Sequence, residues 1–79
     1  MTYTLQVHMQ KAEGSLIRVL GLVGRRGFDV VHASANSIDG GKAMELTVVI
    51  TGVRPGEVLA RQVEKLHDVR RVNLHRIAS

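Results

Sequence analysis

Apolar and polar residues alternate at the start of the chain. The apolar positions are Tyr3, Leu5, Val7 and Met9. A period of two is typical of a β-strand that buries one face. We therefore expect a half-buried strand over residues 3–9, followed by a short loop over residues 11–15.

The pattern then changes to the period of a helix. Its apolar positions are Leu16, Val19, Leu20 and Val23. They stand at i, i+3, i+4 and i+7, which predicts one apolar helix face. Gly21 and Gly24 lie on the other side of this helix, where each costs roughly 1 kcal/mol of helix propensity relative to alanine. Either the helix tolerates this cost, or another part of the protein packs closely against it at these two positions.

The expected end of this helix is the sequence Arg25-Arg26-Gly27. Glycine suits the left-handed residue that closes many helices, and cations in the last turn complement the negative helix end. We interpret Arg26 as a helix-closing residue. For Arg25, helix closure and contact with a partner both remain open.

The next segments predict two more strands. Residues 28–37 are rich in β-formers but alternate poorly, which predicts a strand whose two faces are both partly covered. Asp39-Gly40-Gly41 is a turn signal. Residues 44–51 alternate regularly, with Met44 and Ile50 on the apolar side, and predict a third strand.

The last third of the chain predicts a helix and a strand. Pro55 suits the first turn of a helix. The apolar stripe of this helix is expected to comprise Val58, Leu59, Val63 and Leu66. A final strand is expected over residues 69–77. The order β-α-β-β-α-β predicts an α+β, ferredoxin-like fold, with two helices on one face of a four-stranded antiparallel sheet.

Length and composition narrow the class of protein. The 79 residues predict a single domain over 1–79. The chain has no cysteine, which fits a cytoplasmic location, and no apolar run long enough to span a membrane. The net charge of +4 favours an anionic partner, but aromatic residues make up only 3% of the chain. Because nucleic-acid modules of this fold stack bases on aromatic rings, we expect no nucleic-acid partner.

No catalytic or metal-binding constellation is visible. The four histidines are His8, His32, His67 and His75. They fall on separate predicted elements without metal-ligand spacing. We therefore expect no catalytic residue, no metal site and no cofactor in this chain.

The loop between the first strand and the first helix is the candidate binding site. It contains Lys11, Gly14, Ser15 and Leu16. A helix N-terminus offers free backbone N–H groups to an anion, and Gly14 would allow a ligand to approach the backbone. An ordinary strand-to-helix turn is the simpler interpretation of the same residues.

The run Gly14–Val30, "GSLIRVLGLVGRRGFDV", resembles the ACT domain of the small regulatory subunits of acetolactate synthase (acetohydroxyacid synthase). The matching features are Gly14, Leu16, Arg18, Gly21-Leu22 and Arg26-Gly27-Phe28. Residues 63–72, "VEKLHDVRRV", resemble the second helix and last strand of that family. The chain resembles most the short small subunit of the valine-resistant isozyme II.

Two positions depart from the family pattern. Lys11 and Asp29 stand where the family carries asparagines, whose amides bind the feedback amino acid across the interface of two ACT domains. The resemblance therefore implies a degenerate effector site formed by Lys11, Gly14, Ser15, Leu16 and Asp29. With these two changes, we expect the chain to be insensitive to valine.

The resemblance also implies a role and partners. The chain would be a non-catalytic subunit that binds and activates the large subunit of acetolactate synthase, in branched-chain amino-acid biosynthesis. Thiamine diphosphate, magnesium and FAD would belong to that large subunit. A homodimer through ACT–ACT contact is expected, with an amino acid as the effector if one binds. The alternatives are a free-standing amino-acid-sensing ACT protein and, more distantly, a basic nucleic-acid-binding module.

Overall fold

The computed structural model describes residues 1–77 and confirms the predicted order of elements. The elements are β1 (Thr2–Gln10), α1 (Ser15–Arg25), β2 (Asp29–Ile38), the short 3-10 helix η1 (Asp39–Gly41), β3 (Ala43–Thr51), α2 (Gly56–Glu64) and β4 (Val69–Ile77). Pro55 immediately precedes α2 and has extended backbone, so the helix begins one residue later than predicted.

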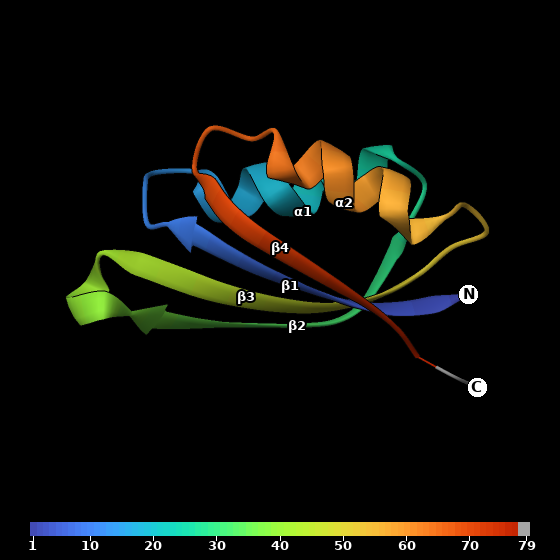
Figure 1. Ribbon diagram of the computed structural model, residues 1–79, viewed down its shortest axis with the longest axis horizontal. Helices are drawn as coiled ribbons and strands as arrows, with labels where there is room; N and C mark the ends of the chain where they lie inside the picture. The colour runs from blue at the N-terminus through green and yellow to red at the C-terminus, as the bar shows by residue number, and fades with distance from the viewer. Residues whose placement is uncertain (78–79) are drawn as a thin grey trace.

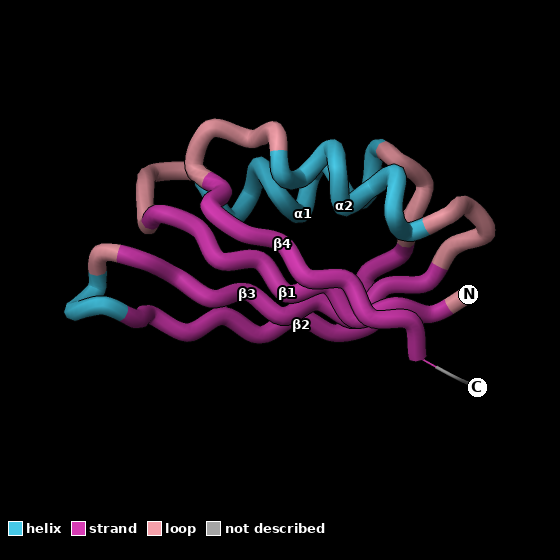
Figure 2. Tube along the Cα trace, in the orientation of Figure 1, coloured by secondary structure: helices cyan, strands magenta, loops and turns pink. Residues whose placement is uncertain are grey.

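The four strands form one antiparallel sheet in the order β2-β3-β1-β4. Figure 1 shows both helices on one face of this sheet, so the opposite face is open. The same two layers can be followed in the trace of Figure 2. Because α1 contacts β2 and α2 contacts β4, each helix lies towards a different edge of the sheet.

The core lies between the sheet and the helices. Tyr3, Leu5, Val7 and Met9 of β1 are 0–2% exposed, as their alternation predicts. Alternate residues of β3 complete the sheet side: Leu46, Val48 and Ile50. The helices add Val19, Leu22, Val23, Leu59 and Val63.

Two details of the predicted helix faces are wrong. In α1 the fully packed positions include Leu22, whereas Leu16 and Leu20 are only partly buried, so the buried face is rotated from the predicted stripe. In α2, Val58 is 51% exposed although it was expected in the apolar stripe. A helix resting on a twisted sheet covers a narrow strip of it, and Leu59 and Val63 occupy that strip in α2.

The prediction that both faces of the second strand are partly covered is also wrong for the single chain. Every residue of β2 from Asp29 to Ser37 is exposed, including Val30 at 43% and Val31 at 63%. The reason is topological. β2 is an edge strand, so no strand pairs with its outer side, and the contact that α1 makes with it leaves these residues exposed.

The end of α1 confirms the predicted helix closure. Gly27 is left-handed, with φ of +86°. Its N–H donates to the carbonyl of Gly24, and the N–H of Phe28 donates to the carbonyl of Val23. These two bonds are those of the Schellman motif, and Phe28 and Val23 both join the core cluster as that motif favours.

The loop before α2 is shaped by two aromatic rings. A Cβ added at Gly56 would lie 2.9 Å from the Tyr3 ring, and one added at Gly52 would lie 2.7 Å from the Phe28 ring. The two rings meet edge to face, with centroids 6.4 Å apart. The loop therefore needs glycine at both positions so that its backbone can lie against these rings.

Candidate functional site

The turn between β1 and α1 has a compact hydrogen-bonded structure. Gly14 is left-handed, with φ of +76°, and directly precedes the helix. The Ser15 hydroxyl is buried and donates to the carbonyl of Ala12, 2.8 Å away. The first N–H groups of a helix have no partner within it. Here the N–H of Ser15 donates to the carbonyl of Ala12 at 3.1 Å, which leaves those of Leu16 and Ile17 without a backbone partner among residues 1–77.

Lys11 connects this turn to β2. Its backbone N–H donates to the carbonyl of Lys42, which continues the sheet pairing beyond β1. Its ammonium donates to the hydroxyl of Ser37 at the far end of β2, 3.1 Å away. The four candidate residues of this turn are thus neighbours in the chain, and the turn lies beside the last residues of β2. They are Lys11, Gly14, Ser15 and Leu16.

Asp29, the fifth candidate residue, lies at the opposite end of the sheet. It begins β2 and pairs with Thr51, which pairs in turn with Thr2 at the start of β1. Lys11 follows the other end of β1, and a strand of this length spans about 27 Å at about 3.3 Å per residue. A single chain therefore does not bring Lys11 and Asp29 together.

An ion pair beside the turn was not foreseen from the sequence. Arg18 of α1 binds the carboxylate of Asp68 in the loop before β4. The Arg18 guanidinium also covers Gly14, where an added Cβ would lie 3.1 Å from it. The contact joins residues 50 positions apart, so no local pattern could reveal it.

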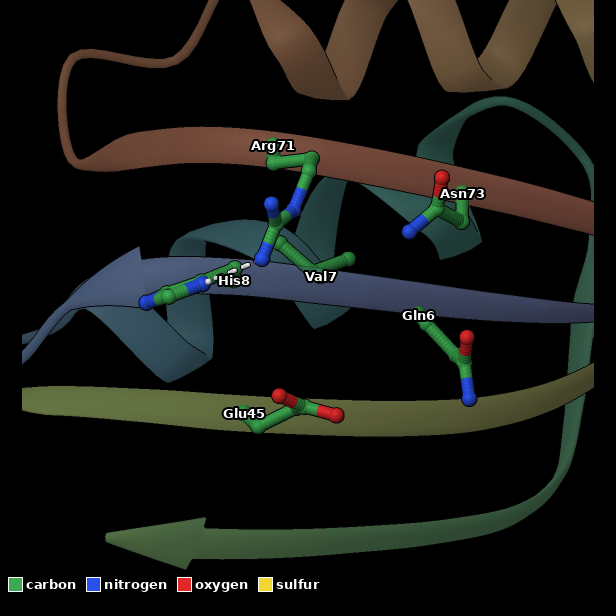
Figure 3. Close-up of a pocket in the computed structure, with 6 residues that line it drawn as sticks. All are labelled: Gln6, Val7, His8, Glu45, Arg71 and Asn73. Atoms are coloured by element: carbon green, nitrogen blue, oxygen red, sulfur yellow. Dashed lines mark hydrogen bonds between the residues drawn. The ribbon is translucent and has the colours of Figure 1, made fainter. Parts of the chain in front are cut away.

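The open face of the sheet carries a polar row. Asn36, Glu45, His8 and Arg71 stand side by side on the four strands. A pocket is lined by three residues of this row, His8, Glu45 and Arg71, together with Gln6, Val7 and Asn73. Figure 3 shows the Arg71 guanidinium hydrogen-bonded to the His8 ring, at 3.2 Å, and Glu45 across β1 from it. The sequence placed His8 on a strand but gave no sign of Arg71 as its neighbour.

A second hollow lies where α1 ends and α2 begins. It is lined by Arg26, Phe28, Arg54, Pro55, Val58 and Leu59. Phe28 and Leu59 are buried and form an apolar floor, while the two arginines are exposed at its rim. Figure 1 places the two helix ends that form it at the end of the molecule opposite the β1–α1 turn.

Within residues 1–77, no group of three or more histidine, cysteine, aspartate or glutamate side chains is placed to hold a metal ion. Neither α1 nor α2 is long and apolar enough to cross a membrane.

The chain belongs to the ACT domain family, because the family model matches residues 11–72. ACT domains are regulatory modules without catalytic groups of their own, and the βαββαβ fold described above is the fold of this family. The prediction of a single domain over the whole of 1–79 extends beyond the matched residues and stays a prediction.

Solved structures share this fold across different proteins. The acetolactate synthase small subunit from Thermotoga maritima aligns with a TM-score of 0.81 at 20% identity, covering 94% of this chain and 47% of that one. The ACT domain of the GTP pyrophosphokinase of Chlorobium tepidum has a TM-score of 0.76 at 13% identity, covering 94% and 96%.

Formyltetrahydrofolate deformylase from Burkholderia mallei aligns with a TM-score of 0.75 at 18% identity, covering 96% of this chain and 28% of that one. The chain therefore spans less than half the length of the small subunit and the deformylase. At these identities the likenesses establish the fold.

Proposed function

We propose that this chain is the regulatory small subunit of an acetolactate synthase, which it binds and activates. The observation that carries the proposal is the run Gly14–Val30, whose glycine, leucine, arginine and "RRGF" positions resemble that family. The structural likeness to an acetolactate synthase small subunit, with a TM-score of 0.81, supports it. In this proposal the thiamine diphosphate, magnesium and FAD belong to the large subunit, and the complex acts in the cytoplasm.

The working form of the chain is a homodimer that pairs through β2. An exposed strand edge is prone to pair with another strand unless charged residues protect it. β4, the other edge, carries Arg70, Arg71 and Arg76, whereas β2 contains no lysine or arginine. Pairing two β2 edges would also cover Val30 and Val31, which the single chain leaves exposed.

The helix beside this edge offers a matching surface. Ile17, Leu20, Gly21 and Gly24 lie at i, i+3, i+4 and i+7 of α1. Ile17 is 75% exposed, and a Cβ added at Gly24 would meet nothing within 4 Å. A second helix can therefore approach closely at Gly24, which gives a reason for its cost in helix propensity. At Gly21 the Arg25 guanidinium lies 3.3 Å from an added Cβ, so a close approach there requires that side chain to move.

Antiparallel pairing also completes the effector site. If two β2 strands pair about their midpoint, residue 29 of one lies opposite residue 38 of the other. The partner's Asp29 then lies beside Ser37, to which the Lys11 ammonium is bonded. We infer that Lys11 and the partner's Asp29 form an ion pair across the interface. This pair occupies the effector position, so the subunit does not respond to valine.

Co-purification tests the proposed function. The chain, expressed with a tag in the cells from which it comes, is expected to retain a large thiamine-diphosphate-dependent enzyme with acetolactate synthase activity. A free-standing amino-acid sensor is the alternative. Recovery of the homodimer alone, together with saturable binding of an amino acid, would favour that sensor over the proposed subunit.

A further inference from the structure

The hollow between the end of α1 and the start of α2 combines apolar and basic side chains. Neither the proposed dimer contact nor the turn between β1 and α1 accounts for it. Its cavity volume is about 50 Å³, and it is open to solvent. Phe28 and Leu59 form the floor, and Val58 at its edge is 51% exposed. We call this feature, lined by Arg26, Phe28, Arg54, Pro55, Val58 and Leu59, the arginine hollow.

Neither arginine of the hollow forms an ion pair with a carboxylate of residues 1–77. Arg26 donates to the side-chain carbonyl of Gln62 at 3.2 Å. Arg54 lies beside Gly27, where an added Cβ would be 3.8 Å from its Nε. Within residues 1–77 the single ion pair joins Arg18 to Asp68, so both guanidiniums are available to an external carboxylate.

The apolar part of this surface extends beyond the hollow. Val53, in the same loop as Arg54, is 90% exposed, and Val58 faces solvent from the first turn of α2. Exposed apolar residues framed by charged ones are typical of protein–protein contact sites. Arginine is favoured at such sites because its planar guanidinium binds a carboxylate in a bidentate manner.

The dimensions favour a protein partner over a free small molecule. Sites for small ligands usually enclose 300–1,000 Å³ and bury most of the ligand surface. This hollow is smaller and open, and its rim residues Arg26, Arg54 and Pro55 are exposed. It can hold one apolar side chain, with charged neighbours of that side chain meeting the arginines on either side.

We propose that the arginine hollow docks an acidic segment of the catalytic large subunit, with an apolar side chain in the hollow and carboxylates on Arg26 and Arg54. The inference rests on the proposed function, since it takes the large subunit as the partner. It assigns large-subunit binding to the end of the chain opposite the Lys11–Leu16 turn, which is the end where Asp29 begins β2. In the proposed dimer, the docking site of one subunit therefore adjoins the effector position that its Asp29 completes.

Variants of the hollow test this inference in a titration of the large subunit. Arg54→Glu reverses one charge of the rim, and Val58→Asp places a carboxylate on the exposed apolar edge. Each is expected to raise the concentration of small subunit needed for half-maximal activation by about tenfold or more. Arg70→Glu is the matched control, because it makes the same charge change at an exposed position of β4. It should leave the titration unchanged.

The outcomes separate the two proposals. Light scattering and thermal unfolding first establish that each variant is folded and dimeric, and Val58→Asp carries the test if Arg54→Glu does not fold. If wild type activates and both hollow variants match it, the docking site is refuted and the proposed function stands. An equal weakening of activation in Arg70→Glu would also refute the docking site, because the overall charge of the chain would then explain the effect. If wild type itself neither binds nor activates the enzyme, both proposals fail.

Discussion

At the loop between β3 and α2, single glycines allow the backbone to pack directly against buried aromatic rings. Gly56 lies against the Tyr3 ring, and a Cβ there would come within 2.9 Å of it. Gly56→Ala must displace a buried ring, so we expect it to lower the free energy of unfolding by about 1–3 kcal/mol. Urea denaturation followed by circular dichroism measures this.

Gly24→Ala is the control for that substitution. Its Cβ would meet nothing within 4 Å, and it lies inside α1. Alanine should therefore raise the unfolding free energy of the monomer by up to about 1 kcal/mol through helix propensity. A Gly56→Ala protein as stable as wild type would show that the ring contact does not constrain the loop.

At the residue scale, the proposed insensitivity to valine is attributed to the charges of Lys11 and Asp29. Isothermal calorimetry should detect no valine binding to the native chain, whereas Lys11→Asn combined with Asp29→Asn should gain measurable affinity. Either single change leaves one charge unpaired at the interface and should weaken the dimer. Tight valine binding by the native protein would contradict the account. Unchanged dimerisation in both single variants would rule out the ion pair.

Sequence reasoning placed these residues well where the cause is local. The left-handed Gly27, the position of Lys11 after β1 and the start of β2 at Asp29 all follow from short-range patterns. The contacts of Tyr3 with Gly56 and of Arg18 with Asp68 could not be predicted in this way. Each joins residues about 50 positions apart, and only the packing of helices on the sheet determines their meeting.

At the scale of elements, β2 is the strand that differs most from its prediction. Its poor alternation was interpreted as partial cover on both faces, yet the single chain leaves both faces exposed. A similar error affected α1, where Leu22 rather than Leu20 is fully packed. Sequence periodicity locates an element well, but the helix rotation and the identity of the edge strand depend on the neighbours in the assembled sheet.

A charge on the β2 edge tests the dimer. Val31 is 63% exposed and lies at an irregularity in the pairing of β2 with β3. Val31→Lys places a cation on the proposed interface, so light scattering should show a monomer at concentrations where wild type is a dimer. Val53→Lys is the control, because Val53 is more exposed and lies in the loop between β3 and α2, outside the edge of β2 that is proposed to pair. If both the Val31→Lys and the Val53→Lys variant remain dimeric, dimerisation through the edge of β2 is excluded.

At the scale of the whole molecule, the order of elements and the four-stranded sheet were predictable. The apolar residues recur with a period typical of strands in some segments and of helices in others. The candidate site was predictable only in part. Lys11, Gly14, Ser15 and Leu16 do cluster at one turn, but Asp29 lies at the other end of β2. Completing that site takes a second copy of the chain, and no single-chain pattern specifies how two copies pair.

Reconstitution of the enzyme tests the central claim most directly. The purified chain is titrated into an acetolactate synthase large subunit from the same cells, and acetolactate formation is measured with and without valine. We expect activity to rise and saturate with added chain, and valine to leave the plateau unchanged. Activity that stays at the level of the large subunit alone, with no co-elution of the two chains, would contradict the account.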